Sequence, residues 1–329
     1  MLKWRGLDDI PADWGRCVAT IGVFDGIHRG HRELIFAAVQ SARAKGVKSV
    51  LVTFDPHPSE VVRAGSHPAQ LSSLSRRAEL AGELGVDVFC VLPFNQELSR
   101  LAPERFVHEI LVERLHVAEV VVGANFTFGH KAAGDLKMLT EFGQRFGFTV
   151  QGVGLLAEDA VTVSSTYIRS CVAAGDVAAA RQALGRPHRV EGVVVRGERR
   201  GRDLGYPTAN VDSPVHAAIP ADGVYAAWFT RFGYEAPEAA LTSGVAYPGA
   251  VSVGTNPTFS GQTRTVEVFV LDADADLYGQ HVAVDFVQRL RGMVKFDSME
   301  ALITAMDADV VKVREVLAAD KAAGDAAQG

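Results

Sequence analysis

Cysteine is scarce in this sequence. Only Cys17, Cys90 and Cys171 occur among 329 residues, and they lie far apart. Their number is odd and no Cys-x-x-Cys pair is present, which argues against a disulfide framework and against a cysteine-based zinc site. A small, odd number of widely separated cysteines fits a reducing environment best, so we expect a cytoplasmic protein.

Excess positive charge and long apolar runs are missing as well. Lys and Arg number 33 against 39 Asp and Glu, a formal net charge of -6, which argues against the basic surface of a nucleic-acid-binding protein. No run of about 18 apolar residues occurs, and the N-terminal segment lacks a signal-type apolar stretch. We expect a soluble protein without a nucleic-acid or membrane partner, in which local positive groups hold any anionic small ligand.

A third absence concerns nucleotide binding. The sequence contains no Gly-x4-Gly-Lys-Ser/Thr loop, so any ATP is held by other means. Residues 152–157, GVGLLA, match a dinucleotide-binding pattern on paper, but a polar segment follows them where that pattern requires a helix. A Rossmann-type role is therefore not expected for these residues.

The first half of the chain alternates short apolar runs with helical patterns. From residue 17 to about residue 185, runs such as CVATIGVF and SVLVTF are separated by amphipathic stretches such as HRELIFAAVQSARAKG. Strands that are apolar on both faces, separated by helices that often end in glycine, predict a parallel sheet covered on both sides. We expect a doubly wound α/β domain, whose ligands gather beyond the carboxyl ends of the strands.

The pattern changes near residue 187. Short β-like runs between Gly, Pro and Asn turns then follow one another, as is typical of a small antiparallel barrel, and only the tail from residue 298 returns to helical periodicity. Length alone also favours two domains. The sequence predicts an α/β domain over residues 1–186 and an antiparallel β-barrel with a terminal helix over residues 187–329.

Two histidines stand where the first strand pattern turns into a helix, in IGVFDGIHRGHREL. If the helix begins near Gly30, His28 and His31 lie beside its unpaired amide groups, which favour an anion. Both imidazoles could donate to phosphate oxygens, and Gly30 would allow close approach to the backbone. Two surface histidines, or half of a metal site, are the alternatives that this pattern leaves open.

Four motifs in one order carry a family resemblance: GVFDGIHRGH, TFDPHP, VVGANFTFG and VSSTYIRS. Together they resemble the nucleotidyltransferase module of the prokaryotic bifunctional riboflavin kinase/FMN adenylyltransferases, the FAD synthetases. The resemblance implies transfer of AMP from ATP to the phosphate of FMN, with catalytic roles for His28 and His31. The nucleotide and phosphate contacts that it implies are Gly22, Phe24, Asp25, Gly30, Asn125, Ser164, Ser165, Thr166 and Arg169, and the flavin contacts are His57, Phe126 and Phe128.

Some of these residues also have a structural interpretation. His57 lies between two prolines and could belong to a rigid turn. Phe126 and Phe128 could pack in the core or stack on a flavin ring. Asn125 stands where many family members carry aspartate, so this site lacks a carboxylate that could hold magnesium.

Residues 207–210, Pro-Thr-Ala-Asn, are a candidate site in the second half of the chain. Strand alternation points Thr208 and Asn210 to one side, where a hydroxyl and an amide oxygen suit a hard cation. An edge hydrogen-bonding pattern is the alternative. The same alternation leaves Glu267 as a lone carboxylate among apolar neighbours. This residue could be a general base or a solvated glutamate at the rim.

With GVYAAWF, VSVGTNPTF and LRGMVKF, these segments resemble the riboflavin kinase module of the same family. The resemblance implies that a riboflavin hydroxyl attacks the terminal phosphate of ATP, with Glu267 as its base. It implies that Thr208 and Asn210 hold magnesium. It also implies a nucleotide contact at Gly201 and a flavin contact at Arg291.

The sequence therefore predicts a bifunctional enzyme of flavin cofactor synthesis. ATP is the expected co-substrate and Mg²⁺ the expected cofactor of both steps, with riboflavin, FMN and ATP as small-molecule partners. Phe269 replaces a histidine that many members carry two residues after the glutamate, which removes one secondary contact. An enzyme with only one of the activities and a non-catalytic flavin or nucleotide sensor are the alternatives, and the sequence leaves a homo-oligomer open.

Overall fold

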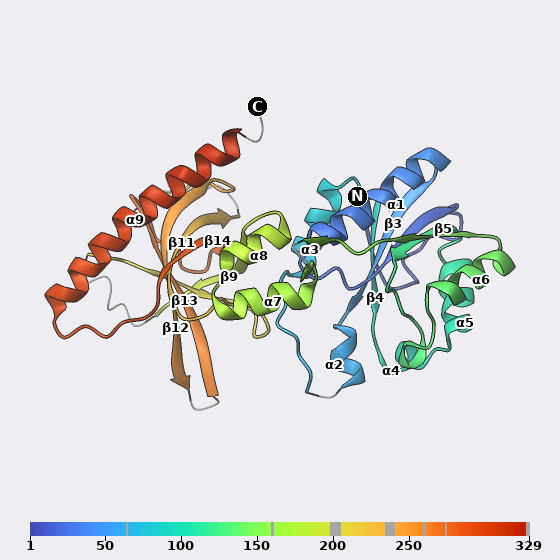
Figure 1. Cartoon of the computed structure of the whole chain (residues 1–329), viewed down its shortest axis with the longest axis horizontal. Coiled ribbons are helices and arrows are strands. Elements are labelled where there is room, and N and C mark those ends of the chain that lie inside the picture. The colour runs from blue at the N-terminus through green and yellow to red at the C-terminus, as the bar shows by residue number, and fades with distance from the viewer. Residues whose placement is uncertain are drawn as a thin grey trace. The chain divides into compact units, whose positions relative to one another are not determined.

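The computed structural model describes residues 1–63, 65–158, 161–197, 205–233, 241–258, 261–273 and 275–326. The chain divides into two compact units (Figure 1). Met1–Pro68 and Ser73–Ser165 form the first unit, and Ala69–Ser72 and Thr166–Gly329 form the second. Each unit has a hydrophobic core of its own, as expected of a domain.

A six-stranded sheet forms the centre of the first unit. Its strands are β1 (Leu2–Arg5), β2 (Cys17–Ile21), β3 (Lys48–Asp55), β4 (Val88–Pro93), β5 (Val117–Gly123) and β6 (Thr149–Val153). They lie in the order β1-β4-β3-β2-β5-β6, and every neighbouring pair is parallel. The chain runs outward from β2 to β3 and β4, and then resumes on the other side of β2 with β5. The strand order therefore reverses between β2 and β5, which is where ligands bind in open α/β sheets.

Helices cover both faces of this sheet (Figure 1). Leu51 of β3 packs in a buried cluster with residues of α1 (Arg29–Lys45) and α3 (Leu74–Glu83). Its neighbours Val50 and Val52 pack in another cluster, with residues of the π-helix η1 (Phe106–Val112) and of α6 (Leu136–Phe146). The predicted doubly wound parallel sheet is confirmed. Shorter elements in the connections are α2 (Pro58–Val62), α4 (Gln96–Ser99), α5 (Pro103–Arg105), the 3₁₀ helix η2 (His130–Ala132), and the hairpin strands β7 (Ala157–Glu158) and β8 (Val161–Thr162).

The second unit is built on a closed antiparallel barrel, as predicted. Its strands are β9 (His188–Val195), β10 (Ala209–Asp212), β11 (Gly223–Phe232), β12 (Ala246–Thr258), β13 (Gly261–Val270) and β14 (His281–Arg291). They close in the order β10-β13-β12-β11-β14-β9, with β9 pairing β10. Val266, Val268 and Val270 of β13 are buried in the barrel core, whereas Glu267 and Phe269 between them are half-buried. The period-two alternation of apolar residues therefore sets which side chains face outward.

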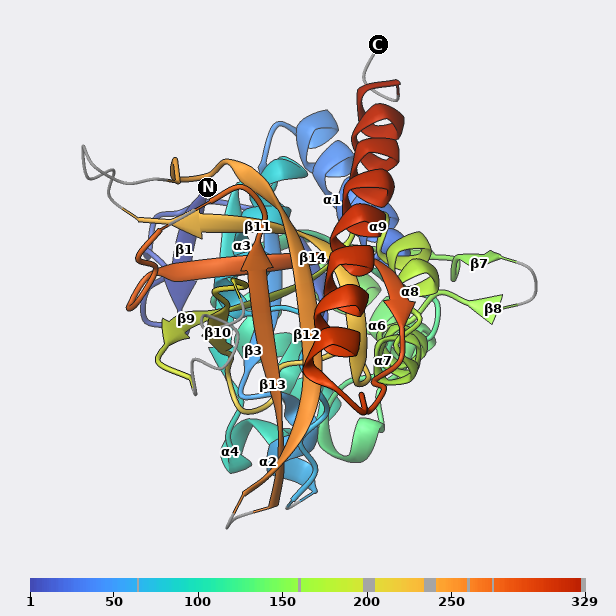
Figure 2. The same cartoon turned by 90° about the vertical axis from the view of Figure 1, so that its left-hand side faces the viewer.

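Helix α9 (Met299–Ala326) packs along the outside of this barrel (Figure 2). Val313 and Leu317 of α9 are buried against Ala226 and Val287 of the strands. The Arg314 guanidinium adds hydrogen bonds to both carboxylate oxygens of Asp272, at 2.7 and 2.6 Å. The predicted terminal helix is therefore an integral part of the second unit.

Two helices connect the sheet to the barrel, α7 (Ser165–Ala174) and α8 (Val177–Leu184). Val177 of α8 is 1% exposed and belongs to the barrel core. The compact units consequently divide at Ser165 and Thr166. The boundary predicted at residues 186 and 187 concerns the residues that each activity needs, and it stays a prediction.

All three cysteines are buried and free. Burial raises the pKa of Cys17 and Cys90 to about 12, so these side chains remain neutral thiols near pH 7. Within the described ranges, no helix has both the length and the apolar character needed to cross a membrane.

Candidate active sites

A cavity of about 960 Å³ lies at the strand-order reversal of the first unit. Residues at or beyond the carboxyl ends of five strands line it, namely Gly22, Phe54, Phe94, Asn125 and Gly154. This is the position that the sheet topology favours for a ligand. The residues predicted for this site that line the cavity are Gly22, Phe24, His28, Gly30, His31, Asn125, Phe126, Phe128, Ser164 and Ser165.

His28 is the N-cap residue of α1. Its Nδ1 accepts a hydrogen bond from the backbone N–H of His31 at 3.3 Å. A ring nitrogen that accepts carries no proton, so in neutral His28 the proton belongs on Nε2, which becomes a donor. The rings of His28 and His31 stack with centroids 3.6 Å apart. Two imidazoles thus lie together on the opening turn of the helix and line one cavity.

The aromatic residues after β5 serve the core and the cavity together. Phe128 is 6% exposed and belongs to the core cluster, Phe126 packs against that cluster, and both line the cavity. Their rings lie nearly parallel, 5.6 Å between centroids and 14° between planes. The two interpretations of these residues are therefore compatible, because one face of a ring can pack while another borders the cavity. Asn125 also lines the cavity and is exposed.

Two other predicted contacts have structural partners in the described chain. His57 is the N-cap of α2, where its Nδ1 accepts from the Ser59 N–H at 3.2 Å and lies 2.7 Å from the Ser59 hydroxyl oxygen. Asp25 is 2% exposed and forms an ion pair with Arg77. These contacts make His57 a helix cap and Asp25 a part of the loop framework.

The SSTYIR segment contributes to two different cavities. Ser164 and Ser165 line the cavity of the histidines. Thr166 begins the second unit. Arg169 lines a cavity of the second unit, and its Nε donates to the carbonyl oxygen of Ala69 at 2.7 Å. The phosphate role predicted for Thr166 and Arg169 stays a prediction.

Three cations that the sequence analysis did not single out line the histidine cavity, namely Arg63, Arg100 and Lys131. Lys131 has a φ of +54°, which is uncommon for a residue with a Cβ. The preceding His130 anchors this turn, because its N–H donates to the carbonyl oxygen of Leu101 at 2.7 Å. None of the three cations belongs to a motif, so only the fold identifies them as positive groups that line this cavity.

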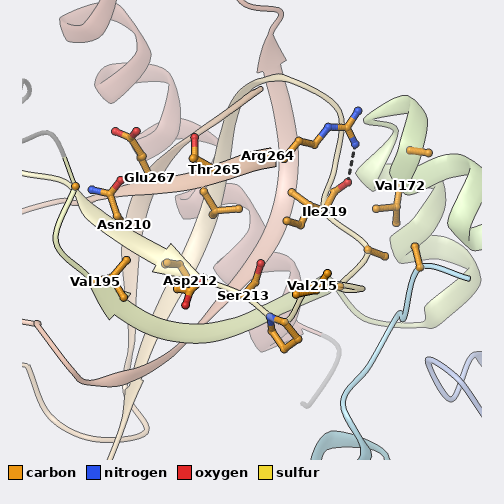
Figure 3. A pocket seen from close by; sticks show the side chains of 18 of the residues that line it. Val172, Val195, Asn210, Asp212, Ser213, Val215, Ile219, Arg264, Thr265 and Glu267 are labelled. Carbon is orange, nitrogen blue, oxygen red and sulfur yellow. Dashed lines mark hydrogen bonds between the residues drawn. The ribbon is translucent and has the colours of Figure 1, made fainter. Parts of the chain in front are cut away.

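A second cavity, of about 810 Å³, lies within the second unit (Figure 3). Asn210 of β10 and Glu267 of β13 line it and are directly opposite each other in the antiparallel register. The Thr208 Oγ1 lies 3.5 Å from a Glu267 carboxylate oxygen, at the outer limit of a hydrogen bond. The structure therefore brings the three residues predicted for phosphoryl transfer together on the outer face of the barrel.

The donor set of these residues fits a hard divalent cation. Thr208 and Asn210 offer a hydroxyl and an amide oxygen, which suit a hard cation such as Mg²⁺, and the Glu267 carboxylate lies beside them. No cluster of three or more His, Cys, Asp or Glu suited to a metal occurs in the part of the chain that the structure describes. The backbone also approaches closely, since a Cβ on Gly197 would lie 2.3 Å from the Asn210 Nδ2. Glycine at this position leaves room for the amide side chain.

The predicted flavin contact Arg291 pairs with α9. Its Nε and one terminal nitrogen donate to the two carboxylate oxygens of Asp309, at 3.0 and 2.6 Å. This fork holds the end of β14 against the helix. Gly201, the predicted nucleotide contact, lies outside the described residues.

Phe269 has a packing partner. Its ring meets the ring of Tyr206 edge-on, with centroids 5.1 Å apart. The Tyr206 hydroxyl donates to the Asp307 carboxylate of α9, and this hydrogen bond raises the pKa of Tyr206 to about 12. Phe269 thus contributes an apolar contact at this position.

The two sites define a class of protein. A histidine-capped helix at the reversal of a parallel sheet suits the phosphates of a nucleotide. A barrel cavity with oxygen ligands beside a carboxylate suits phosphoryl transfer. The molecule is a two-domain transferase that acts on nucleotide phosphates.

Comparisons with known proteins identify the family. Residues 10–167 match the family model of FAD synthetase and residues 184–317 that of riboflavin kinase. The chain is 39% identical over 315 residues to the bifunctional riboflavin kinase/FMN adenylyltransferase of Pseudomonas fluorescens. The aligned residues make up 95% of this chain and 97% of the relative. Identity to the Escherichia coli (strain K12) protein of the same description is 34% over 321 residues, or 97% of this chain and 99% of the relative.

The chain belongs to the bifunctional riboflavin kinase/FMN adenylyltransferase family. It is a bifunctional enzyme with an N-terminal FAD synthetase and a C-terminal riboflavin kinase, and its family uses ATP. A crystal structure described as that of a macrolide-efflux protein from Streptococcus pneumoniae shares the fold, with a TM-score of 0.84 and 30% identity over 95% of this chain and 99% of its own. The family resemblance predicted from the motifs is confirmed.

Proposed function

We propose that riboflavin is phosphorylated in the cavity of the second unit and that FMN is adenylylated in the cavity of the first. The pairing of Asn210 with Glu267 across β10 and β13, with Thr208 beside them, supports the first assignment best. The stacked His28 and His31 at the N-terminus of α1 support the second.

The kinase reaction needs a proton acceptor. A hydroxyl oxygen of riboflavin forms a bond to the terminal phosphorus of ATP while the bond to the bridging oxygen breaks and ADP leaves. The hydroxyl proton must be taken up, and we assign this role to Glu267, the carboxylate that lies beside Thr208 and Asn210. Its half-buried position on β13, fixed by the barrel register, sets where the hydroxyl must lie.

Thr208 and Asn210 would hold Mg²⁺ through their side-chain oxygens. When bound there with a nucleotide, the ion neutralises the phosphate charge that develops during transfer. The chain supplies two neutral oxygens at these positions, so phosphate oxygens and water complete the coordination that such an ion requires.

Replacement of Asn210 tests this metal assignment. Asn210→Ala removes one oxygen ligand, so the Mg²⁺ concentration for half-maximal riboflavin phosphorylation should rise by about ten-fold or more. Asn210→Asp keeps an oxygen in place and should need far less extra magnesium. Titration of both half-reactions with Mg²⁺ measures the effect. An unchanged requirement in Asn210→Ala would remove this residue from the metal site.

Adenylyl transfer needs no base, because the phosphate of FMN is already an anionic nucleophile. Its oxygen attacks the α-phosphorus of ATP, and the bond to the departing pyrophosphate breaks. Catalysis can then rest on positioning and charge stabilisation. The Nε2–H of His28 and the ring of His31 are the groups that we assign to the phosphates, with Ser164 and Ser165 on the same cavity.

The direct test follows riboflavin, FMN and FAD by chromatography after incubation with ATP and Mg²⁺. FMN should form from riboflavin, and FAD from FMN supplied alone. An enzyme that retains one activity would fail in one of these assays. A sensor would bind flavin without forming either product, and that outcome would overturn the proposed function.

We also propose that residues 1–186 suffice for adenylyl transfer. A fragment ending at Arg186 keeps the whole sheet and every residue of the histidine cavity. It should convert FMN to FAD, with a modest loss because it exposes apolar surface of α8 such as Val177. Circular dichroism establishes whether the fragment is folded. A folded fragment without activity would show that residues beyond 186 take part in the reaction.

A further inference from the structure

The loop that carries the histidines has an unusual backbone. Phe24, Gly26 and Ile27 have φ angles of +52°, +82° and +35°. Positive φ costs little at glycine, but at a β-branched residue such as isoleucine it is strained and persists only where the surroundings impose it. Phe24 and Ile27 are both almost fully buried, at 1% and 0% exposure. Because the loop is buried, its polar groups need hydrogen-bond or ionic partners within the protein.

Arg77 of α3 contacts two of these polar groups. Its guanidinium donates to the carbonyl oxygen of Val23 at 3.1 Å, and another of its terminal nitrogens lies 3.9 Å from the Asp25 carboxylate. The side chains of Arg77 and Asp25 are 6% and 2% exposed. Two further groups hold the same peptide units: the Thr53 hydroxyl donates to the Val23 carbonyl and the Ser165 hydroxyl to the Asp25 carbonyl, each at 2.9 Å.

Arg77 is a charged residue on the buried face of α3. It lies on the face of the helix that buries Ala78, Leu80 and Ala81, where an apolar side chain would satisfy the core. Replacing both partners of a buried ion pair by well-packed apolar residues is often neutral for a fold, but removing Arg77 alone would leave the buried Asp25 carboxylate without this cation and would cost stability. The distinctive property of Arg77 is geometric, since one nitrogen of its planar fork donates to the Val23 carbonyl while another lies 3.9 Å from the Asp25 carboxylate, two residues further along the chain.

We propose that Arg77 is a positioning residue for adenylyl transfer. By holding Val23 and Asp25, it fixes the strained turn that leads directly into His28, and so sets where the His28 imidazole faces the departing pyrophosphate. The inference rests on the proposed role of His28. Loss of the fork should let the turn relax, and small displacements of a catalytic group cost large factors in rate.

The test compares Arg77→Met with Arg76→Met. Arg76 is the adjacent arginine on the same helix, and it pairs outside the cavity with Glu79 at 3.0 Å. Arg77→Met should lower kcat for FAD formation roughly ten- to a hundred-fold, while riboflavin phosphorylation by the same protein stays unchanged. Arg76→Met should leave both half-reactions near wild type. If Arg77→Met does not fold, Arg77→Lys keeps the charge, cannot span both partners, and should show a smaller loss of the same kind.

Inhibition by added pyrophosphate separates positioning from a structural role. A destabilised enzyme has fewer active molecules, which lowers the apparent kcat but leaves the inhibition constant unchanged. A displaced His28 binds pyrophosphate more weakly, so the constant should rise by about the same factor as kcat falls. An unchanged constant, whatever the loss of rate, would make Arg77 structural and overturn the proposal.

A double-mutant cycle that combines Arg77→Met with His28→Asn tests whether Arg77 acts through His28. If Arg77 acts through His28, the double variant should be no slower than His28→Asn alone, because the contribution of the fork has already been lost. Effects that multiply would show an independent role and overturn the inference. If His28→Asn itself forms FAD at the wild-type rate, the proposed function of the histidine fails instead, so the two failures are distinguishable.

Discussion

Glu267→Gln should abolish most riboflavin phosphorylation while leaving FAD formation from FMN intact. Glutamine keeps the size and the hydrogen-bonding reach of the side chain beside Thr208 and Asn210, but it cannot take up the hydroxyl proton. Removal of a general base typically costs about a hundred-fold or more in rate. The adenylyl transfer is spared because its nucleophile is already ionised. Initial rates for each half-reaction, measured separately, give the two numbers.

Asp212 provides a matched control for this variant. It also lies on β10 and lines the same cavity, but its register partner is Val193 of β9, not Glu267. Asp212→Asn removes one carboxylate from the same surroundings and should keep most of the kinase activity. Near-normal phosphorylation by Glu267→Gln, or equal losses in the two variants, would exclude Glu267 as the base and leave only a general electrostatic effect of the cavity.

Apolar periodicity was sufficient to predict both folds. The β3 run is apolar on both faces because helices cover both sides of the parallel sheet, so Leu51 and Val52 pack in different clusters. The alternation placed Val266, Val268 and Val270 on one face of a strand and Glu267 on the other, and the three valines are buried in the barrel core. Period and burial are local consequences of the fold class, so a sequence carries them directly.

The missed residues are those whose role depends on partners distant in sequence. Arg77 reads as one of two arginines in an amphipathic helix, and only its spacing from the buried Leu80 and Ala81 hints that it lies on the inner face. Its partners Val23 and Asp25 are about fifty positions away along the chain. Lys131 likewise becomes a candidate anion contact only when the turn around it closes on the cavity. Motifs identify residues that lie close together in the sequence, whereas the roles of these side chains depend on tertiary packing.

The other large effect expected is the loss of FAD formation in His28 variants, with riboflavin phosphorylation retained. In the proposed mechanism, His28→Ala removes a donor to the charge that develops on pyrophosphate, and loss of one such preorganised donor costs on the order of a hundred-fold in rate. FMN should then accumulate when riboflavin is supplied. Chromatography of the three flavins over time detects this directly. His108 is a histidine of the first unit whose side chain is 45% exposed, and His108→Ala should form FAD normally.

His28 is also a helix cap, so alanine alone would confuse two effects. Its Nδ1 accepts from the His31 N–H, and replacing a capping side chain by alanine costs about 0.5–2 kcal/mol of stability. His28→Asn separates them, because asparagine is among the best N-cap residues and restores an acceptor near the Nδ1 position, yet has no imidazole. Melting temperatures should therefore return toward wild type in His28→Asn while FAD formation stays about a hundred-fold reduced. Recovery of activity together with stability would mean that His28 only starts the helix, and the charge stabilisation assigned to it would have to come from His31 and the cations of the same cavity.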